Sequence, residues 1–156
     1  AAAGEITVLV GGDEAVFDEH RAVLAAIGDP VLYMGPLGSA AVIKVITNML
    51  AFINLVSVGE ALMLAKRGGL DLAKSFEAIL NSSGNSFVHE TESQVILNGS
   101  RDISFGMDLV MKDIGLFQKI AESHRVPLEI SPLMISTICR GVRPLSATGC
   151  RPAINS

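Results

Sequence analysis

The chain has 156 residues, of which 49% are hydrophobic and 18% charged, so it can bury a core and is too apolar for intrinsic disorder. Its net charge of −4 and its few aromatic side chains offer neither a basic surface for phosphate backbones nor a stacking platform for bases, so we expect no nucleic-acid partner. Cys139 and Cys150 are too far apart for a CxxC pair and the histidines lack metal-ligand spacing, so we expect no metal and a cytoplasmic location, or an organellar matrix if a transit peptide precedes the chain.

The first 34 residues predict a β-α-β segment. Residues 5–10 are mostly β-branched and apolar, which is typical of a strand. Asp13 is a plausible N-cap for a helix that stops at Gly28-Asp29-Pro30, and residues 31–34 read as a second strand. This segment is too small to bury its own faces, so we expect it to be the trailing edge of a larger α/β domain.

A long helix should follow, because the segment after residues 35–39 contains hardly any helix breaker before Gly68-Gly69. At 1.5 Å per residue, about 30 residues give a spine of roughly 45 Å. Residues 49–65 are apolar enough to raise the possibility of a membrane span, but Asn54 and Glu60 interrupt them. We therefore expect no membrane partner and a helix buried on most sides.

The remaining periodicity predicts four shorter helices, at residues 71–80, 87–97, 107–124 and 131–138. Residues 139–156 have neither helical nor strand periodicity and are predicted to be an irregular tail. The expected fold is therefore mainly α: residues 37–138 form an all-helical domain with a long spine helix, preceded at residues 1–36 by the edge of an α/β domain.

Lys44 is the first candidate for chemistry, because it lies four positions before Asn48 in an otherwise apolar helical run. Apolar surroundings disfavour the charged form of a lysine, which makes its amine able to donate and accept protons near neutral pH. The Asn48 amide could orient a substrate oxygen or the amine. The alternative is that Lys44 reaches to the surface along the core and Asn48 contacts a neighbouring loop.

Gly35 and Gly38 place a turn with little side-chain bulk at the start of this helix, where exposed backbone N–H groups suit a carboxylate. Alone, a Gly-Pro followed by a glycine marks only a turn. Together with Lys44 and Asn48, it predicts a site for a small anionic hydroxyacid.

Three stretches, residues 9–13, 34–48 and 60–62, resemble the 3-hydroxyisobutyrate dehydrogenase family of β-hydroxyacid dehydrogenases, which is related to 6-phosphogluconate dehydrogenase. The resemblance covers most of residues 1–138. It implies that residues 1–36 are the C-terminal remnant of a Rossmann NAD(P)-binding domain. It implies that Lys44 is the catalytic acid/base and that Gly38, Ser39 and Asn48 bind substrate. The third glycine of the family pattern is Ala40 here.

A second match lies at residues 105–113. The resemblance implies that Phe105 walls the substrate pocket, that Lys112 reaches the nicotinamide cofactor, and that Asp113 belongs to the same cofactor-binding segment and orients the catalytic amine. Without the resemblance, Lys112-Asp113 would be an ordinary solvated pair on an amphipathic helix. Asn85 and Ser86 lie in a turn that could either approach substrate or cap a helix.

The resemblance implies an oxidoreductase that uses NAD or NADP and a small 3-hydroxyacid such as 3-hydroxyisobutyrate or tartronate semialdehyde, and that pairs as a homodimer through the helical domain. No strand followed by Gly-x-Gly-x-x-Gly occurs, so we expect the main cofactor site to lie outside this chain and the fragment alone to be inactive. The rival hypothesis is a non-catalytic helical dimerisation module.

Overall fold

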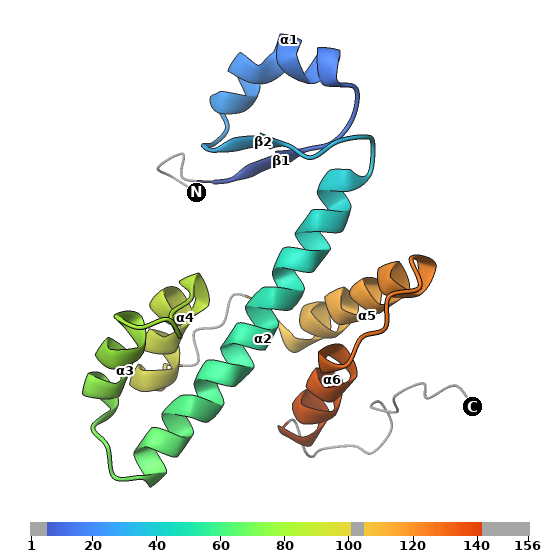
Figure 1. Cartoon of the computed structure of the whole chain (residues 1–156). Helices are drawn as coiled ribbons and strands as arrows, with labels where there is room; N and C mark the ends of the chain where they lie inside the picture. Colours follow the sequence, from blue (N-terminus) through green and yellow to red (C-terminus); the bar gives the residue numbers. More distant parts are fainter. Residues whose placement is uncertain (1–5, 101–104, 142–156) are drawn as a thin grey trace. The chain divides into compact units, whose positions relative to one another are not determined.

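The computed structural model describes residues 6–100 and 105–141, which form a mainly helical protein with a small two-stranded parallel sheet (Figure 1). The chain divides into two compact units between Asn48 and Met49, within one helix. The predicted domain boundary lies between residues 36 and 37, where the β-α-β segment ends and the long helix begins. It stays a prediction.

The first unit contains the predicted β-α-β segment: β1 (Val8–Val10), α1 (Glu14–Ala25) and β2 (Val31–Tyr33). The strands are parallel, with Val8 opposite Val31 and Val10 opposite Tyr33. Asp13 caps α1 as predicted, since its carboxylate accepts from the backbone N–H groups of Ala15 and Val16 at 2.9 and 3.3 Å.

Only one side chain of α1, Phe17, is buried. Its ring stacks on Tyr33 of β2, with 5.1 Å between the ring centroids, and the Arg21 guanidinium lies 5.4 Å from its centroid. Val16 and Val23 of this helix and Ile27 just after it are exposed. A two-stranded sheet can cover only one side of a helix, which agrees with the expectation that this segment does not bury its own faces.

The predicted spine is α2 (Ser39–Arg67), which runs for 29 residues and ends with Lys66 and Arg67 in its last turn. In the second unit, α3 (Leu72–Leu80) and α4 (Phe87–Asn98) lie on one side of α2, and α5 (Met107–Ser123) and α6 (Ile130–Gly141) lie on the other (Figure 1).

The core of the second unit is formed by Met49, Ile114 and Met134, one residue each from α2, α5 and α6. Half-buried apolar side chains surround this cluster: Phe52, Ile53, Val56, Val110, Phe117, Ile135 and Ile138. Truncating a fully buried residue such as Ile114 is expected to cost about 2–5 kcal/mol. The cluster therefore fixes α5 and α6 against the middle of α2.

The expectation that α2 is buried on most sides is wrong for this chain. Only Met49, Val58 and Leu62 are buried, whereas Leu50, Met63 and Leu64 are 55–74% exposed. Two flanking helix pairs cover two stripes of a helix and leave the others open. By length and composition alone, α2 also qualifies as a membrane span, the one such helix among the described residues.

The last helix is longer than predicted. The sequence analysis began the irregular tail at Cys139, but the backbone stays helical through Gly141. Helix ends are the least certain part of a sequence-based assignment, because the final turn has no strong stop signal before Pro144. The rest of the predicted tail, residues 142–156, lies outside the described residues.

Candidate functional site

The turn that starts α2 has the conformation that its glycines allow. Gly35 has φ +108° and Gly38 has φ +98°, a region that side chains other than glycine rarely adopt. The backbone N–H of Ser39 then donates to the Pro36 carbonyl at 3.0 Å, and Val42 donates to the Gly38 carbonyl at 3.1 Å, which begins the helix. The predicted glycine turn is therefore confirmed in the backbone.

The end of β1 holds this turn in place. A Cβ atom on Gly11 would lie 3.0 Å from the Pro36 carbonyl oxygen and 3.1 Å from the Ala40 nitrogen, so the strand passes the helix start closely. The Gly12 N–H donates to the Gly35 carbonyl at 2.9 Å. The first turn of α2 is thus braced by backbone contacts, which are more rigid than side-chain contacts.

Tyr33 adds a side-chain hydrogen bond to these backbone contacts, because its hydroxyl donates to the Gly12 carbonyl at 2.8 Å. Partial burial raises the pKa of Tyr33, and the carboxylates of Glu14, Asp13 and Asp18 raise it further. A phenol with a raised pKa keeps its proton and remains a donor over a wider pH range.

Lys44 and Asn48 lie four residues apart on α2 and therefore on one face of this helix, as predicted. The predicted apolar surroundings of Lys44 are not found, because its side chain is exposed. Ala41 and Thr47 are exposed with it, at a spacing of three residues, whereas the apolar neighbours Val42, Ile43, Val45 and Ile46 are half-buried. The apolar residues next to Lys44 in sequence point to other sides of the helix, which is why sequence proximity misled the prediction.

Phe105 lies just before α5, next to the N-cap residue Gly106, and is 39% exposed. Its ring contacts Phe52 of α2, with centroids 5.8 Å apart and planes tilted by 34°. The sequence analysis did not single out Phe52. Its spacing of four residues from Asn48 was the available signal, but an aromatic residue in an apolar helix usually reads as core.

Lys112 and Asp113 form an ion pair within α5, with 3.4 Å between the lysine Nζ and the carboxylate Oδ1. The Lys112 side chain is 60% exposed and that of Asp113 only 10% exposed. A pair with one exposed partner contributes little to stability. The amine of Lys112 is therefore accessible to a ligand while it contacts the largely buried carboxylate of Asp113.

The predicted site residues thus fall into two groups. Gly38, Ser39, Lys44 and Asn48 belong to the first unit, and Phe105, Lys112 and Asp113 belong to the second. Each group has the local geometry described above. That the two groups form one site in the full-length protein stays a prediction.

The turn at Asn85 and Ser86 acts as a helix cap. The Ser86 hydroxyl accepts from the His89 N–H at 3.1 Å, and the Asn85 amide donates to the Glu90 carboxylate at 2.7 Å. The capping interpretation is confirmed, and an approach to substrate stays a prediction.

His89 is fully buried, with an exposed fraction of 0%, and both ring nitrogens are hydrogen-bonded. The Phe76 carbonyl lies 3.0 Å from Nε2 and can only accept, so Nε2 carries the hydrogen. In the neutral ring, Nδ1 then accepts from the Ser93 hydroxyl at 2.9 Å. His89 is therefore a buried histidine whose hydrogen bonds are all made within the protein.

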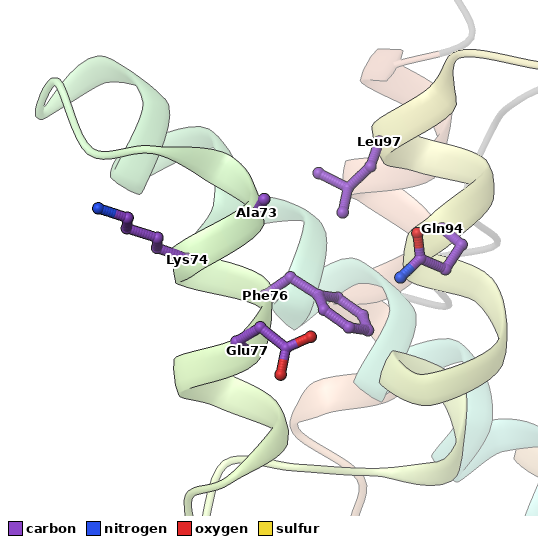
Figure 2. A pocket seen from close by; sticks show the side chains of 6 residues that line it. All are labelled: Ala73, Lys74, Phe76, Glu77, Gln94 and Leu97. Carbon is purple, nitrogen blue, oxygen red and sulfur yellow. The ribbon is translucent and has the colours of Figure 1, made fainter.

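A groove of about 460 Å³ lies between α3 and α4 (Figure 2). Phe76 and Leu97 face into it, whereas the Lys74 amine points away from α4. None of the predicted site residues lines this groove, and within residues 6–100 and 105–141 no cluster of histidine, cysteine and acidic residues could hold a metal ion.

Comparison with known proteins places the chain among hydroxyacid dehydrogenases. It is 35% identical over 146 residues to the 2-(hydroxymethyl)glutarate dehydrogenase of Eubacterium barkeri, a match that covers 93% of this chain and 48% of the relative. It is 36% identical over 136 residues to the mitochondrial 3-hydroxyisobutyrate dehydrogenase of Rattus norvegicus, covering 82% and 40% of the two chains. The chain therefore spans about half the length of the curated relatives that it matches.

The fold is also similar to a crystal structure of 3-hydroxyisobutyrate dehydrogenase from Salmonella typhimurium. The TM-score is 0.80 at 29% identity, and the match covers 90% of this chain and 50% of that one.

The expectation that the main cofactor site lies outside this chain is not supported, because residues 38–142 match a family that is itself described as NAD-binding. The search for Gly-x-Gly-x-x-Gly tested only for a pyrophosphate-binding turn, and other segments that contact a dinucleotide need not carry that motif. The family model is described as "NAD-binding of NADP-dependent 3-hydroxyisobutyrate dehydrogenase", and the chain belongs to this family.

Proposed function

We propose that this chain supplies the proton-transfer residue of an NAD(P)-dependent dehydrogenase of small 3-hydroxyacids, with Lys44 as the general acid/base. The observation that carries the proposal is the braced start of α2, where the Gly38 turn, Lys44 and Asn48 follow one another on a single rigid helix. Family membership supports the reaction class.

In this proposal the first turn of α2, near Gly38 and Ser39, binds the substrate carboxylate, because a helix N-terminus favours an anion. The Lys44 amine takes the proton of the 3-hydroxyl group and returns it in the reverse direction. Asn48 orients the same oxygen. Nicotinamide, when bound, accepts the hydride.

The exposed amine of Lys112 fits a contact to the cofactor, because it is 60% exposed and needs no rearrangement of the core to meet a ligand. The Asp113 carboxylate would hold the Lys112 amine in position. Since Lys44 is exposed in this chain, we assign its shielding from water to the bound substrate and cofactor.

The substrate class follows from what the two sequence relatives share. Both 3-hydroxyisobutyrate and 2-(hydroxymethyl)glutarate, named for those relatives, are 3-hydroxypropanoates that differ in the group on carbon 2. A site built from a helix N-terminus, an amine and an amide recognises the shared carboxylate and hydroxyl groups. We therefore propose a 2-substituted 3-hydroxypropanoate as substrate.

The test is the turnover of the full-length enzyme and its Lys44→Ala variant on a panel of 3-hydroxyacids with NAD and NADP. We expect kcat to fall by about 10²–10⁴-fold, the usual contribution of a positioned acid/base. Lys66→Ala is the matched control, because Lys66 is an exposed lysine in the last turn of the same helix and should leave kcat unchanged. Near-parental turnover of Lys44→Ala would contradict the mechanism.

We also propose that α2 pairs with a second copy of the chain, because its exposed apolar side chains Leu50, Met63 and Leu64 need a cover. Glu60 and Asn54 are exposed on the same helix, and a carboxylate facing lipid is costly, which favours protein over membrane. Light scattering of the full-length protein should show a dimer that Leu64→Glu dissociates.

Leu37→Glu is the control for that experiment, since Leu37 is 90% exposed and lies outside α2. A monomeric parent, or a parent that sediments with lipid vesicles, would contradict the pairing.

A further inference from the structure

The end of α4 carries the one Asn-Gly pair of the sequence, Asn98-Gly99. Asn98 is the last residue of the helix, and Gly99 caps it in the left-handed conformation, with φ +66°. Both residues are exposed, and a Cβ atom on Gly99 would meet nothing within 4 Å. The peptide between them therefore lies at an open surface, and Gly99 has no side chain that would hinder an approach to its nitrogen.

A hydrogen bond polarises the side-chain amide of Asn98. The backbone N–H of Ser100 donates to Asn98 Oδ1 at 2.8 Å. When a nucleophile adds to Cγ, negative charge develops on this oxygen, and a donor that is already in place stabilises that charge. The nitrogen of Gly99 is the nucleophile next in the chain, and its bond to Cγ would close a five-membered ring.

Asn81 and Asn85, which lie between α3 and α4, are held differently. At Asn81 the following nitrogen, that of Ser82, donates to the Ile79 carbonyl at 3.1 Å. At Asn85 the following N–H donates to Oδ1 of the same asparagine at 2.8 Å, so the nitrogen that would attack is itself the donor. Both asparagines also donate a hydrogen bond from their side-chain nitrogen, at 2.8 and 2.7 Å. Of these three positions, Asn98 is therefore the one prepared for attack.

We propose that Asn98-Gly99 is a site of spontaneous deamidation through a succinimide, and that the Ser100 N–H promotes the reaction. The Gly99 nitrogen bonds to Cγ of Asn98 and loses its proton, the bond from Cγ to the side-chain nitrogen breaks, and ammonia leaves. Water then opens one of the two C–N bonds of the ring that reach this nitrogen, which leaves aspartate or isoaspartate at position 98. The last residue of a helix can leave the helical conformation for this attack, because terminal turns open at little cost.

The product changes the end of α4 in two ways. A carboxylate replaces a neutral amide at a helix C-terminus, where negative charge is unfavourable. Isoaspartate also lengthens the backbone by one methylene group, which displaces the Gly99 cap from the helix. The modification is independent of the proposed function, since it requires neither substrate nor cofactor.

The test incubates the full-length protein at mildly alkaline pH in water enriched in heavy oxygen and follows each asparagine by peptide mass mapping. We expect Asn98 to take up the label at least about tenfold faster than Asn81 and Asn85, since a placed donor to the developing charge contributes at least this much. Asn98→Gln should stay unmodified, because its longer side chain would have to close a six-membered ring.

Ser82→Gly is the matched control, because it creates a second Asn-Gly pair at a position whose attacking nitrogen donates to the Ile79 carbonyl. In the folded variant Asn81 should remain slower than Asn98. In urea the two pairs should react at similar rates, because the unfolded chain retains neither hydrogen bond.

Equal rates for Asn81 and Asn98 in folded Ser82→Gly would overturn the proposal, because the sequence pair alone would then set the rate. It would also be overturned by a folded parent that keeps Asn98 intact for as long as the urea-unfolded chain takes to convert it.

Discussion

Two ionisable side chains of this chain lie in opposite environments. Lys44, on the braced start of α2, is exposed, whereas His89, between α3 and α4, is fully buried with both ring nitrogens hydrogen-bonded. A buried group whose hydrogen bonds are all made within the protein stabilises the fold and has no capacity left for a ligand. A group on a rigid element with an open side can contact a substrate, so exposure distinguishes the proposed catalytic residue, Lys44, from the structural residue, His89.

Among substitutions of the polar side chains His89, Tyr33 and Lys44, His89→Ala should have the largest effect on stability. It leaves a cavity and removes the partners of the Ser93 hydroxyl and the Phe76 carbonyl, which together should cost about 2–4 kcal/mol in the free energy of unfolding, measured with urea. His20→Ala is the control, because His20 is exposed and bonds only within its own helix, to Val16. If His89→Ala left stability unchanged but impaired turnover, His89 would be the residue with a role in catalysis, and the comparison would be wrong.

A smaller effect is expected for Tyr33→Phe, which removes the hydrogen bond to the Gly12 carbonyl at 2.8 Å. Because the pKa of Tyr33 is raised by partial burial and then by Glu14, Asp13 and Asp18, the folded chain favours the neutral phenol. This stabilisation is complete below the ordinary tyrosine pKa of about 10 and is lost as the pH rises through the raised value. The urea midpoint of unfolding, measured at increasing alkaline pH, should fall in the unsubstituted protein by more than in Tyr33→Phe. Identical pH profiles of the two proteins would contradict this contribution of Tyr33.

The smallest effect should follow Lys44→Met, which exchanges an exposed amine for an uncharged chain of similar length. We expect the free energy of unfolding to change by no more than about 0.5 kcal/mol, as is usual for surface substitutions. Circular dichroism during urea unfolding measures this. A large loss would mean that Lys44 has a structural role.

The sequence predicted the order and type of the elements because their signals are local. Asp13 and Asp71 cap the helices that they were expected to begin, and Gly35 and Gly38 form the expected turn. The end of α6 was misplaced, since residues 139–141 continue the helix without a strong stop signal.

Exposure was less predictable, because it depends on which elements pack together. The apolar neighbours of Lys44 suggested burial, but the helix distributes them to other sides. Phe52 and His89 each contact a residue of another segment, Phe105 and Phe76, which no local pattern could pair with them. The motif thus yields candidate residues, and only the packing of the helices reveals their surroundings.

The most direct measurement of the central claim is chemical rescue of Lys44→Ala in the full-length enzyme by small primary amines. If the Lys44 amine carries the proton, turnover should rise in proportion to the concentration of free amine and depend on its basicity, whereas Lys66→Ala should not respond. High turnover of Lys44→Ala without amine, or no response to any amine in a variant that still binds substrate, would contradict the account.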